Sequence, residues 1–379
     1  MKIPTLFRYA FGVAVSAVLL AGCSNGGSSS GLANGIGPGG ITPASVLGHG
    51  GLGHATEVER LIANARLHPD ITKRHFNPHW KWVKRDLALS PRLLFQGDET
   101  DGTVNVFLMG SPNKPKGMSD HVGTVTGFQL PFGECADTMG NVFVVDYLAK
   151  NITRISRNGT AFEILKDLDG SPVSCAVDPS GTGNVAVTNL NGADGSTGNV
   201  VIYVGGDQPG QEVTNPDMMQ MDFAAYDTSG DLWVDGSDAA GNFVLSSCTL
   251  SGCTTIPISG GTIGEAGFVQ WARGQNMWYV ADDACVTPDH FCIYPVAGSG
   301  ALGSSIHLED GEGITVCSMF QGVITNSQSK VFVGGANDSV CGGGASVDRW
   351  PFPAGGARTN GNDNIVGPTG TAISAKPNP

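Results

Sequence analysis

The acids and histidines of this chain are the side chains that could perform acid–base or metal chemistry, and few of them have the spacing that such chemistry needs. His75 and His79 would place two metal ligands on one helix face, but Pro78 between them breaks that face. Residues 167–170 and 227–231 partly resemble calcium loops, yet they lack the later ligands and the terminal glutamate, so we interpret them as hairpin turns. The sequence contains no nucleophile elbow, P-loop, His-Glu-x-x-His motif or haem-attachment motif.

The start of the chain has the order of an export signal. Basic residues come first, an apolar run from 11 to 20 follows that is too short to span a bilayer, and small residues come directly before Cys23. This arrangement resembles the bacterial lipobox, which implies that residues 1–22 are removed and that Cys23 becomes the lipidated N-terminus. The alternative is an ordinary secretory signal followed by a chance cysteine. Ser24, rather than an aspartate, resembles the sorting pattern for the outer membrane.

The composition of the chain limits its partners and its fold class. Residues 23–54 are rich in glycine and serine and are predicted to form a flexible tether. The whole chain has 56 glycines, 15% charged residues and a formal net charge of -13. No basic stretch is visible outside residues 73–85, so we do not expect a nucleic-acid partner. Many short strands joined by tight turns are the expected architecture.

A segment of roughly forty-five residues recurs along the chain, with copies that begin near residues 131, 172, 223, 267 and 320. Each copy offers an apolar strand, an Asp-x-x-Gly type of turn, a second strand rich in aromatic and β-branched residues, a loop and a third alternating strand. A repeat of this length with up to four strands is typical of a β-propeller.

The two ends of the repeat region complete each other. Residues 93–107 supply the second and third strands of an incomplete first unit, and residues 368–374 supply its missing first strand, which would place Leu94 beside Ile373. Such closure removes an open sheet edge. We therefore predict an all-β, six-bladed β-propeller over residues 91–375. Through its Pro-x-Gly, Asp-x-x-Gly-Asn and Val-x-Val-x-Asp elements the chain resembles NHL-repeat and related six-bladed propellers, which include gluconolactonase-like and streptogramin-lyase-like enzymes as well as non-enzymatic binders.

Residues 55–90 precede the propeller and are predicted to contain a short helix that packs against it. The residues at helical spacing are Val58, Leu61, Ile62 and Ala65. Pro69 is expected to stop the helix, and Trp80 and Trp82 are expected to anchor the segment.

Eight cysteines remain besides Cys23, and an even number in an exported chain favours disulfides over metal or redox sites. The positions relative to the predicted strands suggest four pairs: Cys248 with Cys253, Cys285 with Cys292, Cys317 with Cys341, and Cys135 with Cys175. The last pair rests on matching positions in adjacent blades, and two buried free thiols remain the alternative there.

The central channel is where enzymatic relatives would be expected to hold metal ligands or acid–base groups. The position before Cys135, followed through the repeats, reads Glu134, Ser174, Ala224, Gln270, Val323 and Thr371. A hard divalent cation prefers several oxygen ligands, and only one of these six residues is a carboxylate. Asp222 and Glu265 lie near the same strand entries and could join Glu134 if the alignment is off by a residue or two.

These residues lead to one functional hypothesis and two rivals. The predicted function is a cell-envelope lipoprotein whose propeller binds a protein or small-molecule ligand, without a cofactor, a metal or catalytic residues. The candidate ligand-binding residues are Glu134, Asp222, Glu265 and Gln270, together with the loop aromatics Tyr147, Trp278 and Trp350. Each of them could instead serve turn polarity or blade packing. The rivals are a metal-dependent lactonase, hydrolase or lyase of the gluconolactonase-like or streptogramin-lyase-like kind, and a structural spacer.

Overall fold

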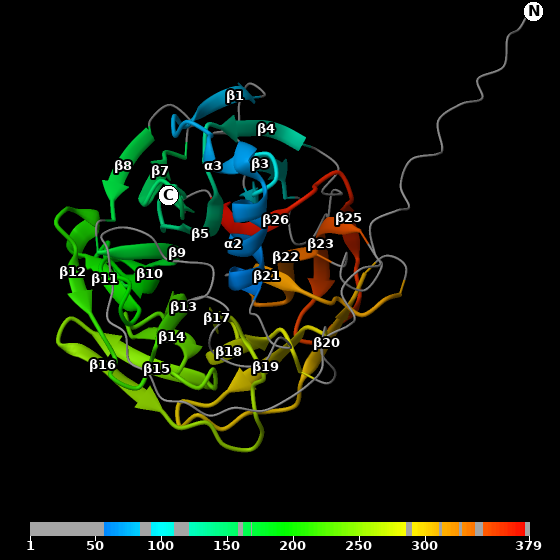
Figure 1. Cartoon of the computed structure of the whole chain (residues 1–379). Coiled ribbons are helices and arrows are strands. Elements are labelled where there is room, and N and C mark those ends of the chain that lie inside the picture. The colour runs from blue at the N-terminus through cyan, green and yellow to red at the C-terminus, as the bar shows by residue number, and fades with distance from the viewer. Residues whose placement is uncertain are drawn as a thin grey trace, which may run out of the picture. The chain divides into compact units, whose positions relative to one another are not determined.

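The computed structural model describes residues 57–83, 92–109, 121–157, 162–167, 169–285, 290–310, 313–325, 328–337 and 344–375. The predicted signal peptide, the predicted lipidation site at Cys23 and the predicted tether lie outside these residues. The described part of the chain forms six sheets that are arranged as blades around a central axis (Figure 1). The prediction of an all-β, six-bladed propeller is confirmed.

Each blade runs from a strand at the outer edge to an innermost strand near the axis. From the outside inward, the first blade contains β1 (His79–Val83), β4 (His121–Thr126), β3 (Thr103–Leu108), β2 (Arg92–Asp98) and β26 (Pro368–Ala375). The second contains β8 (Phe162–Lys166), β7 (Asn151–Ile155), β6 (Val142–Asp146) and β5 (Pro131–Ala136). The third contains β12 (Gln211–Val213), β11 (Asn199–Tyr203), β10 (Val185–Gly192) and β9 (Gly170–Val177), with a short 3-10 helix, η2 (Val204–Gly206), after β11.

The other three blades follow the same order. The fourth contains β16 (Gly252–Ile256), β15 (Phe243–Thr249), β14 (Leu232–Ser237) and β13 (Gln220–Tyr226). The fifth contains β24 (Gly356–Ala357), β20 (Ile306–Glu309), β19 (Cys292–Val296), β18 (Met277–Asp282) and β17 (Ala266–Ala272). The sixth contains β25 (Asn360–Asn362), β23 (Ala345–Pro351), β22 (Val331–Asn337) and β21 (Met319–Ile324).

The ring closes by strand pairing between distant parts of the chain. Strand β26 forms the innermost strand of the first blade and pairs with β2, and Leu94 lies opposite Ile373 as predicted. The two strands stay paired from Arg92 opposite Ala375 to Asp98 opposite Pro368. Because β26 covers the inner edge of β2, the early strands of this blade leave no unpaired backbone edge of their own toward the axis.

An aspartate at the end of a second strand holds the chain where it enters the innermost strand of the same blade. The Asp146 carboxylate accepts hydrogen bonds from the backbone N–H groups of Gln129, at 2.6 Å, and Leu130, at 3.1 Å. Asp282 repeats the contact in the fifth blade, where the N–H groups of Gly264 and Glu265 each donate at 3.0 Å. The last residue of the Val-x-Val-x-Asp element is therefore a buried anchor, which explains its recurrence.

The Asp-x-x-Gly element forms the turn between the first and second strands, as predicted. In the second blade the Asp137 carboxylate accepts hydrogen bonds from the backbone and side-chain N–H groups of Asn141, at 2.8 and 2.6 Å. Gly140 in the same turn has a φ of 82°, a left-handed conformation that glycine adopts without steric cost.

The N-terminal helix packs against the propeller with the predicted face. Helix α2 (Glu57–Leu67) buries Val58, Leu61, Ile62 and Ala65, and each of these side chains is at most 4% exposed. The helix ends before Pro69, and Pro69 begins the single-turn helix α3 (Pro69–Thr72). The predicted stop at the proline is confirmed.

Residues 73–83, which follow α3, are not helical, and part of this stretch joins the propeller. Strand β1 pairs with β4 and adds a fifth strand to the outer edge of the first blade. The register of this pairing shifts between Trp80, which lies opposite Val125, and Trp82, which lies opposite Thr124. Trp80 is half-buried and packs against the core of this blade, as expected of an anchor.

Three of the four predicted disulfides are present in the described residues. They join Cys135 to Cys175, Cys248 to Cys253 and Cys285 to Cys292. The first links the innermost strands of adjacent blades across a Cα–Cα distance of 5.6 Å, so the alternative of two free thiols is wrong. Cys317 is also disulfide-bonded, and its predicted partner Cys341 lies outside the described residues. Disulfides indicate an oxidising compartment.

Removal of β26 should destroy the cooperative fold. We expect deletion of residues 368–379 to lower the free energy of unfolding by at least about 4 kcal/mol, because β2 loses its inner partner and the buried residues of β26 are lost. Urea unfolding followed by circular dichroism measures this. Deletion of residues 376–379, which begins after β26 ends, is the matched control. Equal midpoints for the two truncations would contradict the closure argument.

Candidate ligand-binding site at the channel mouth

Helix α2 closes one end of the central channel. Its buried side chains belong to the same apolar cluster as residues near the starts of the innermost strands, including Phe132, Phe223 and Phe320. Two polar contacts fix its position: the Gln220 side-chain amide donates to Glu59 at 3.2 Å, and Arg60 donates to the Ser318 hydroxyl at 3.4 Å. Figure 1 shows α2 across the centre of the ring. The end of the channel at which the innermost strands begin is therefore covered by α2.

The middle of the channel is filled by aromatic rings. The ring of Phe320 lies 5.1 Å from that of Phe132 and 5.2 Å from that of Phe223, measured between centroids. All three side chains are at most 2% exposed. Because these rings occupy the axis, the channel is not a continuous pore. What remains is a cup that opens at the ends of the innermost strands.

The cup has a volume of about 200 Å³ and receives residues from all six innermost strands. Its lining combines small apolar residues with many polar ones, so it is more polar than the usual small-molecule site. The polar and aromatic residues of the lining are Arg92, Glu134, Asp137, Thr138, Tyr226, Thr228, Gln270, Trp271, Arg273, Gln321 and Thr325. We call this cavity the mouth cup.

The mouth cup contains positive charge that the protein does not neutralise. Arg92 and Arg273 both line it, and the Arg273 side chain is exposed and makes no hydrogen bond or ion pair within the described part of the chain. Asp137, in contrast, is already engaged by Asn141 and lies 3.8 Å from the Arg154 guanidinium. In a protein with a formal net charge of -13, a cup with available positive charge favours an anionic ligand.

The predicted site residue Glu134 lines the cup, but its carboxyl group points at the first blade. A Cβ at Gly97 would lie 3.4 Å from Glu134 Oε1, and one at Gly370 would lie 2.8 Å from its Cγ, so these glycines make room for the side chain. Both carboxyl oxygens are buried and lack a hydrogen-bond partner among the described residues. Burial raises the pKa of Glu134 well above its ordinary value, because the charged form loses its hydration.

Trp271 is the functional candidate that sequence reasoning missed. It lines the cup one residue after Gln270, and its indole N–H is buried without a hydrogen-bond partner in the described structure. Its ring lies edge-on to Trp278, with centroids 5.1 Å apart, and Trp278 stacks on Trp233 at 4.3 Å. The stack holds Trp271 in place, and an unused indole N–H at a cavity can donate a hydrogen bond to a ligand.

The four predicted binding residues do not come together at one site. Glu134 and Gln270 line the mouth cup, whereas Asp222 lies under α2 at the opposite end of the channel, near Glu59. Glu265 lies at the entry to β17, where its N–H donates to Asp282. A realignment by one or two residues therefore cannot bring Asp222 and Glu265 to Glu134.

Strand pairing also corrects the predicted alignment in the fifth and sixth blades. Glu134 lies opposite Val144, and the equivalent places are taken by Val269 opposite Val280 and by Gly322 opposite Gly334. Gln270 and Val323 each lie one residue further along. The bulge between these strands lies at the same place in all three blades and does not cause the shift. The paired residues are ten residues apart from Glu134 to Val144, eleven from Val269 to Val280 and twelve from Gly322 to Gly334, so the hairpins differ in length.

The three aromatics predicted for ligand-binding loops are packing residues instead. Tyr147 is 9% exposed, with its ring 5.2 Å from that of Phe132. Trp278 lies in β18 and is 5% exposed, and Trp350 lies in β23, fully buried, where its indole N–H donates to the Glu309 carbonyl at 2.8 Å. All three side chains pack within the propeller, as the blade-packing alternative expects.

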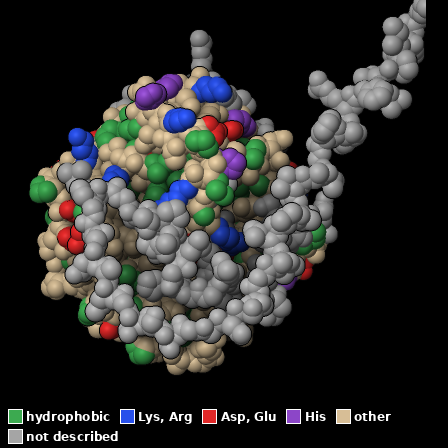
Figure 2. Space-filling view, in the orientation of Figure 1, with side chains coloured by type: hydrophobic (Ala, Val, Ile, Leu, Met, Phe, Trp, Pro, Cys, Tyr) green, Lys and Arg blue, Asp and Glu red, His purple; other side chains and the backbone are tan. Residues whose placement is uncertain are grey.

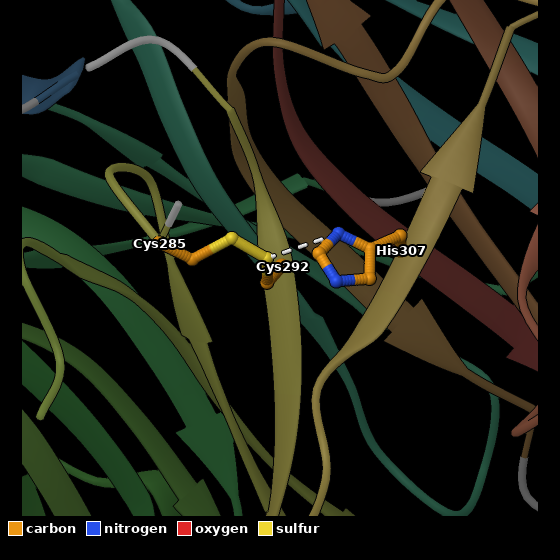
Figure 3. A group of neighbouring side chains, drawn as sticks. All are labelled: Cys285, Cys292 and His307. Atoms are coloured by element: carbon orange, nitrogen blue, oxygen red, sulfur yellow. Dashed lines mark hydrogen bonds between the residues drawn. A yellow bond between two sulfur atoms is a disulfide. The ribbon is translucent and has the colours of Figure 1, made fainter. Parts of the chain in front are cut away.

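Two further features lie outside the mouth cup. Lysine, arginine and histidine side chains gather over α3 and β1 (Figure 2), and exposed members of this stretch are Lys73, His75, His79 and Lys81. In the described residues, the one close cluster of three side chains that could each supply a metal ligand is Cys285, Cys292 and His307 (Figure 3). None of the helices in these residues is long and apolar enough to cross a membrane.

Comparisons with known proteins support the fold alone. No known protein family matches the sequence, and no curated protein is significantly similar to it. Among solved structures, a chain of the nidogen/laminin complex is 12% identical, with a TM-score of 0.55 over 75% of this chain and 99% of that chain. TolB from Acinetobacter baumannii is 10% identical, with a TM-score of 0.54 over 77% of this chain and 68% of TolB. A streptogramin B lyase is 13% identical with a TM-score of 0.40, which is too low to support a shared activity.

Asp222 should make the stability of the protein depend on pH. Burial, and secondarily the charge of Glu59, raises the pKa of Asp222 to about 8. The folded protein therefore keeps this proton, whereas the unfolded chain releases it near the ordinary pKa of 3.8. The free energy of unfolding consequently falls as the pH rises from about 4 to about 8. Asp222→Asn should gain about 2–4 kcal/mol relative to the unmodified protein between pH 5 and pH 8.

Urea unfolding at pH 5, 6.5 and 8 measures this difference. Asp207→Asn, which changes an exposed aspartate, is the matched control and should follow the unmodified protein at each pH. A constant offset between Asp222→Asn and the unmodified protein across this range would show that Asp222 ionises normally.

Proposed function

We propose that this chain is a lipid-anchored protein of the bacterial cell envelope whose propeller binds a small anionic ligand in the mouth cup. A propeller fold suits a binding scaffold, and it also suits a lyase, so the proposal rests on the site rather than on the fold. The observation that carries it is the pair Arg273 and Trp271, which line the same cavity: the Arg273 guanidinium is unengaged, and the buried Trp271 indole N–H has no partner in the described structure.

The ligand chemistry follows from the lining of the cup. A carboxylate or similar anion can accept hydrogen bonds from both Arg273 and Trp271, and guanidinium groups recognise such anions with two parallel bonds. Gln270 beside them can donate or accept. The cup volume of about 200 Å³ is below the range of roughly 300–1,000 Å³ that is usual for ligand pockets, so it suits a very small molecule or the end of a longer one.

The anchoring part of the proposal rests on the sequence around Cys23 and on the disulfides. An export signal that ends at a lipobox-like cysteine supports lipidation and attachment to the outer membrane. Disulfides in the propeller agree with an oxidising, extracytoplasmic compartment.

The rival function, a metal-dependent lactonase or a related hydrolase or lyase, requires several oxygen ligands at one point. Glu134 faces the first blade and Asp222 lies under α2, at the other end of the channel. Since the predicted acids are separated in this way, we base the proposal on binding.

Binding of carboxylates should depend on Arg273. We expect titration calorimetry to detect binding of at least one member of a panel of acetate, benzoate, succinate and citrate, and to detect no binding of benzamide, the neutral counterpart of benzoate. Arg273→Gln should weaken the carboxylate affinity about tenfold or more, because a charge-assisted hydrogen bond of about 1.5–3 kcal/mol is lost.

Lys81→Gln is the matched control, because it removes one positive charge from exposed strand β1 at the outer edge of a blade. It should leave the carboxylate affinity unchanged. Equal affinities for benzoate and benzamide, or equal losses in both variants, would refute an anion site at the mouth cup.

Lipidation should depend on Cys23. In a bacterial host that is fed labelled palmitate, the full chain should carry the label and fractionate with membranes. Cys23→Ser should remove the label and release the protein into the soluble extracytoplasmic fraction, since the thiol is the predicted acceptor. Cys135→Ser, which removes a propeller cysteine, should keep the label. A labelled Cys23→Ser variant would favour a different anchor.

A further inference from the structure

The disulfide between Cys285 and Cys292 has a histidine built against one of its sulfurs. In the pairing of β19 with β20, Cys292 lies directly opposite His307, so the backbone register brings the two side chains together. The His307 Nδ1 atom lies 3.4 Å from the Cys292 Sγ atom, and its Nε2 atom lies 3.1 Å from the Ser305 hydroxyl. Figure 3 shows the imidazole on the Cys292 side of the disulfide, with Cys285 beyond it.

The two sulfurs of this disulfide differ in environment. Cys292 is fully buried, whereas Cys285 is partly exposed and lies in the turn after β18. His307 itself is exposed. An external thiol can therefore reach Cys285. His307, which can assist a departing sulfur, lies beside Cys292.

The other two disulfides of the described chain lack this feature. Cys285, Cys292 and His307 form the one close cluster of three cysteine, histidine or acid groups in the described residues, so neither Cys135–Cys175 nor Cys248–Cys253 has a histidine or carboxylate held against it in this way. As a disulfide, Cys285 and Cys292 offer no thiolate, and the cluster is not a metal site in this state.

We propose that Cys285–Cys292 is an exchangeable disulfide that accepts an external thiol at Cys285, with His307 stabilising the departing Cys292 sulfur. The substrate class is a thiolate, either of a small thiol or of an exposed cysteine on another protein. The site is separate from the mouth cup and does not depend on the proposed ligand.

The exchange step is balanced without any further oxidant or reductant. The external thiolate attacks Cys285 Sγ and forms a mixed disulfide there, the bond between the two protein sulfurs breaks, and its electron pair stays on Cys292 Sγ. The His307 Nδ1–H group then donates a hydrogen bond or a proton to that sulfur. Because a more stable departing thiolate leaves faster, this contact accelerates opening. In the reverse step Cys292 attacks Cys285 and expels the external thiol.

The test uses the purified full chain with all its disulfides formed, treated with reduced glutathione, quenched with acid and mapped by mass spectrometry. We expect Cys285–Cys292 to open at least about tenfold faster than Cys248–Cys253, which is an internal reference, and glutathione to be found on Cys285. His307→Ala should slow the opening of Cys285–Cys292 about tenfold and leave the rate at Cys248–Cys253 unchanged.

His75→Ala is the matched control, since it removes an exposed histidine from the segment before β1 and should change neither rate. Thermal unfolding of each variant shows that the propeller is intact. Glutathione on Cys292, an unchanged opening rate in His307→Ala, or equal opening of the two disulfides would each overturn the proposal. Carboxylate binding at the mouth cup should be the same in His307→Ala, so this proposal and the proposed function fail independently.

Discussion

The pairing of β26 with β2 is the interaction on which the rest of this structure depends. Six sheets around an axis make a defined cavity only if the ring is closed, and one late strand completes the earliest blade. Once closed, the ring brings the ends of all six innermost strands to one point, which creates the mouth cup. The buried aspartates that hold the entries to innermost strands, such as Asp146 and Asp282, fix where those strands begin. The position of each innermost strand at the axis therefore depends on hydrogen bonds made where the strand begins.

Much of the fold could be predicted because it depends on local patterns. Asp-x-x-Gly turns and alternating apolar residues recur at a regular spacing, and both follow from backbone geometry within a few residues. The pairing of Leu94 with Ile373 followed from counting strands, and the buried face of α2 followed from helical spacing. The link between Cys135 and Cys175 could be proposed for the same reason, since the two cysteines come from adjacent repeats.

The site could not be predicted to the same degree, because it depends on features that the repeat does not encode. The hairpins of the fifth and sixth blades are longer than that of the second, which displaces Gln270 and Val323 by one residue from the positions equivalent to Glu134, and the repeat does not reveal this difference in length. The sequence places Asp222 near a strand entry but does not show that α2 covers that end of the channel. Trp271 was missed because only the stack with Trp278 and Trp233 shows which way its ring is held. The observed site therefore differs from the expected one in the burial of Glu134 and Asp222 and in the presence of Trp271.

The phenylalanines on the axis, Phe132, Phe223 and Phe320, give the cup a floor. A molecule that enters must leave by the route it came in, and no competitor can push it out from behind. A longer compound can place only its tip inside, with the remainder held outside in solvent. Under the proposed function, recognition would therefore depend on the terminal group of a ligand and not on its length.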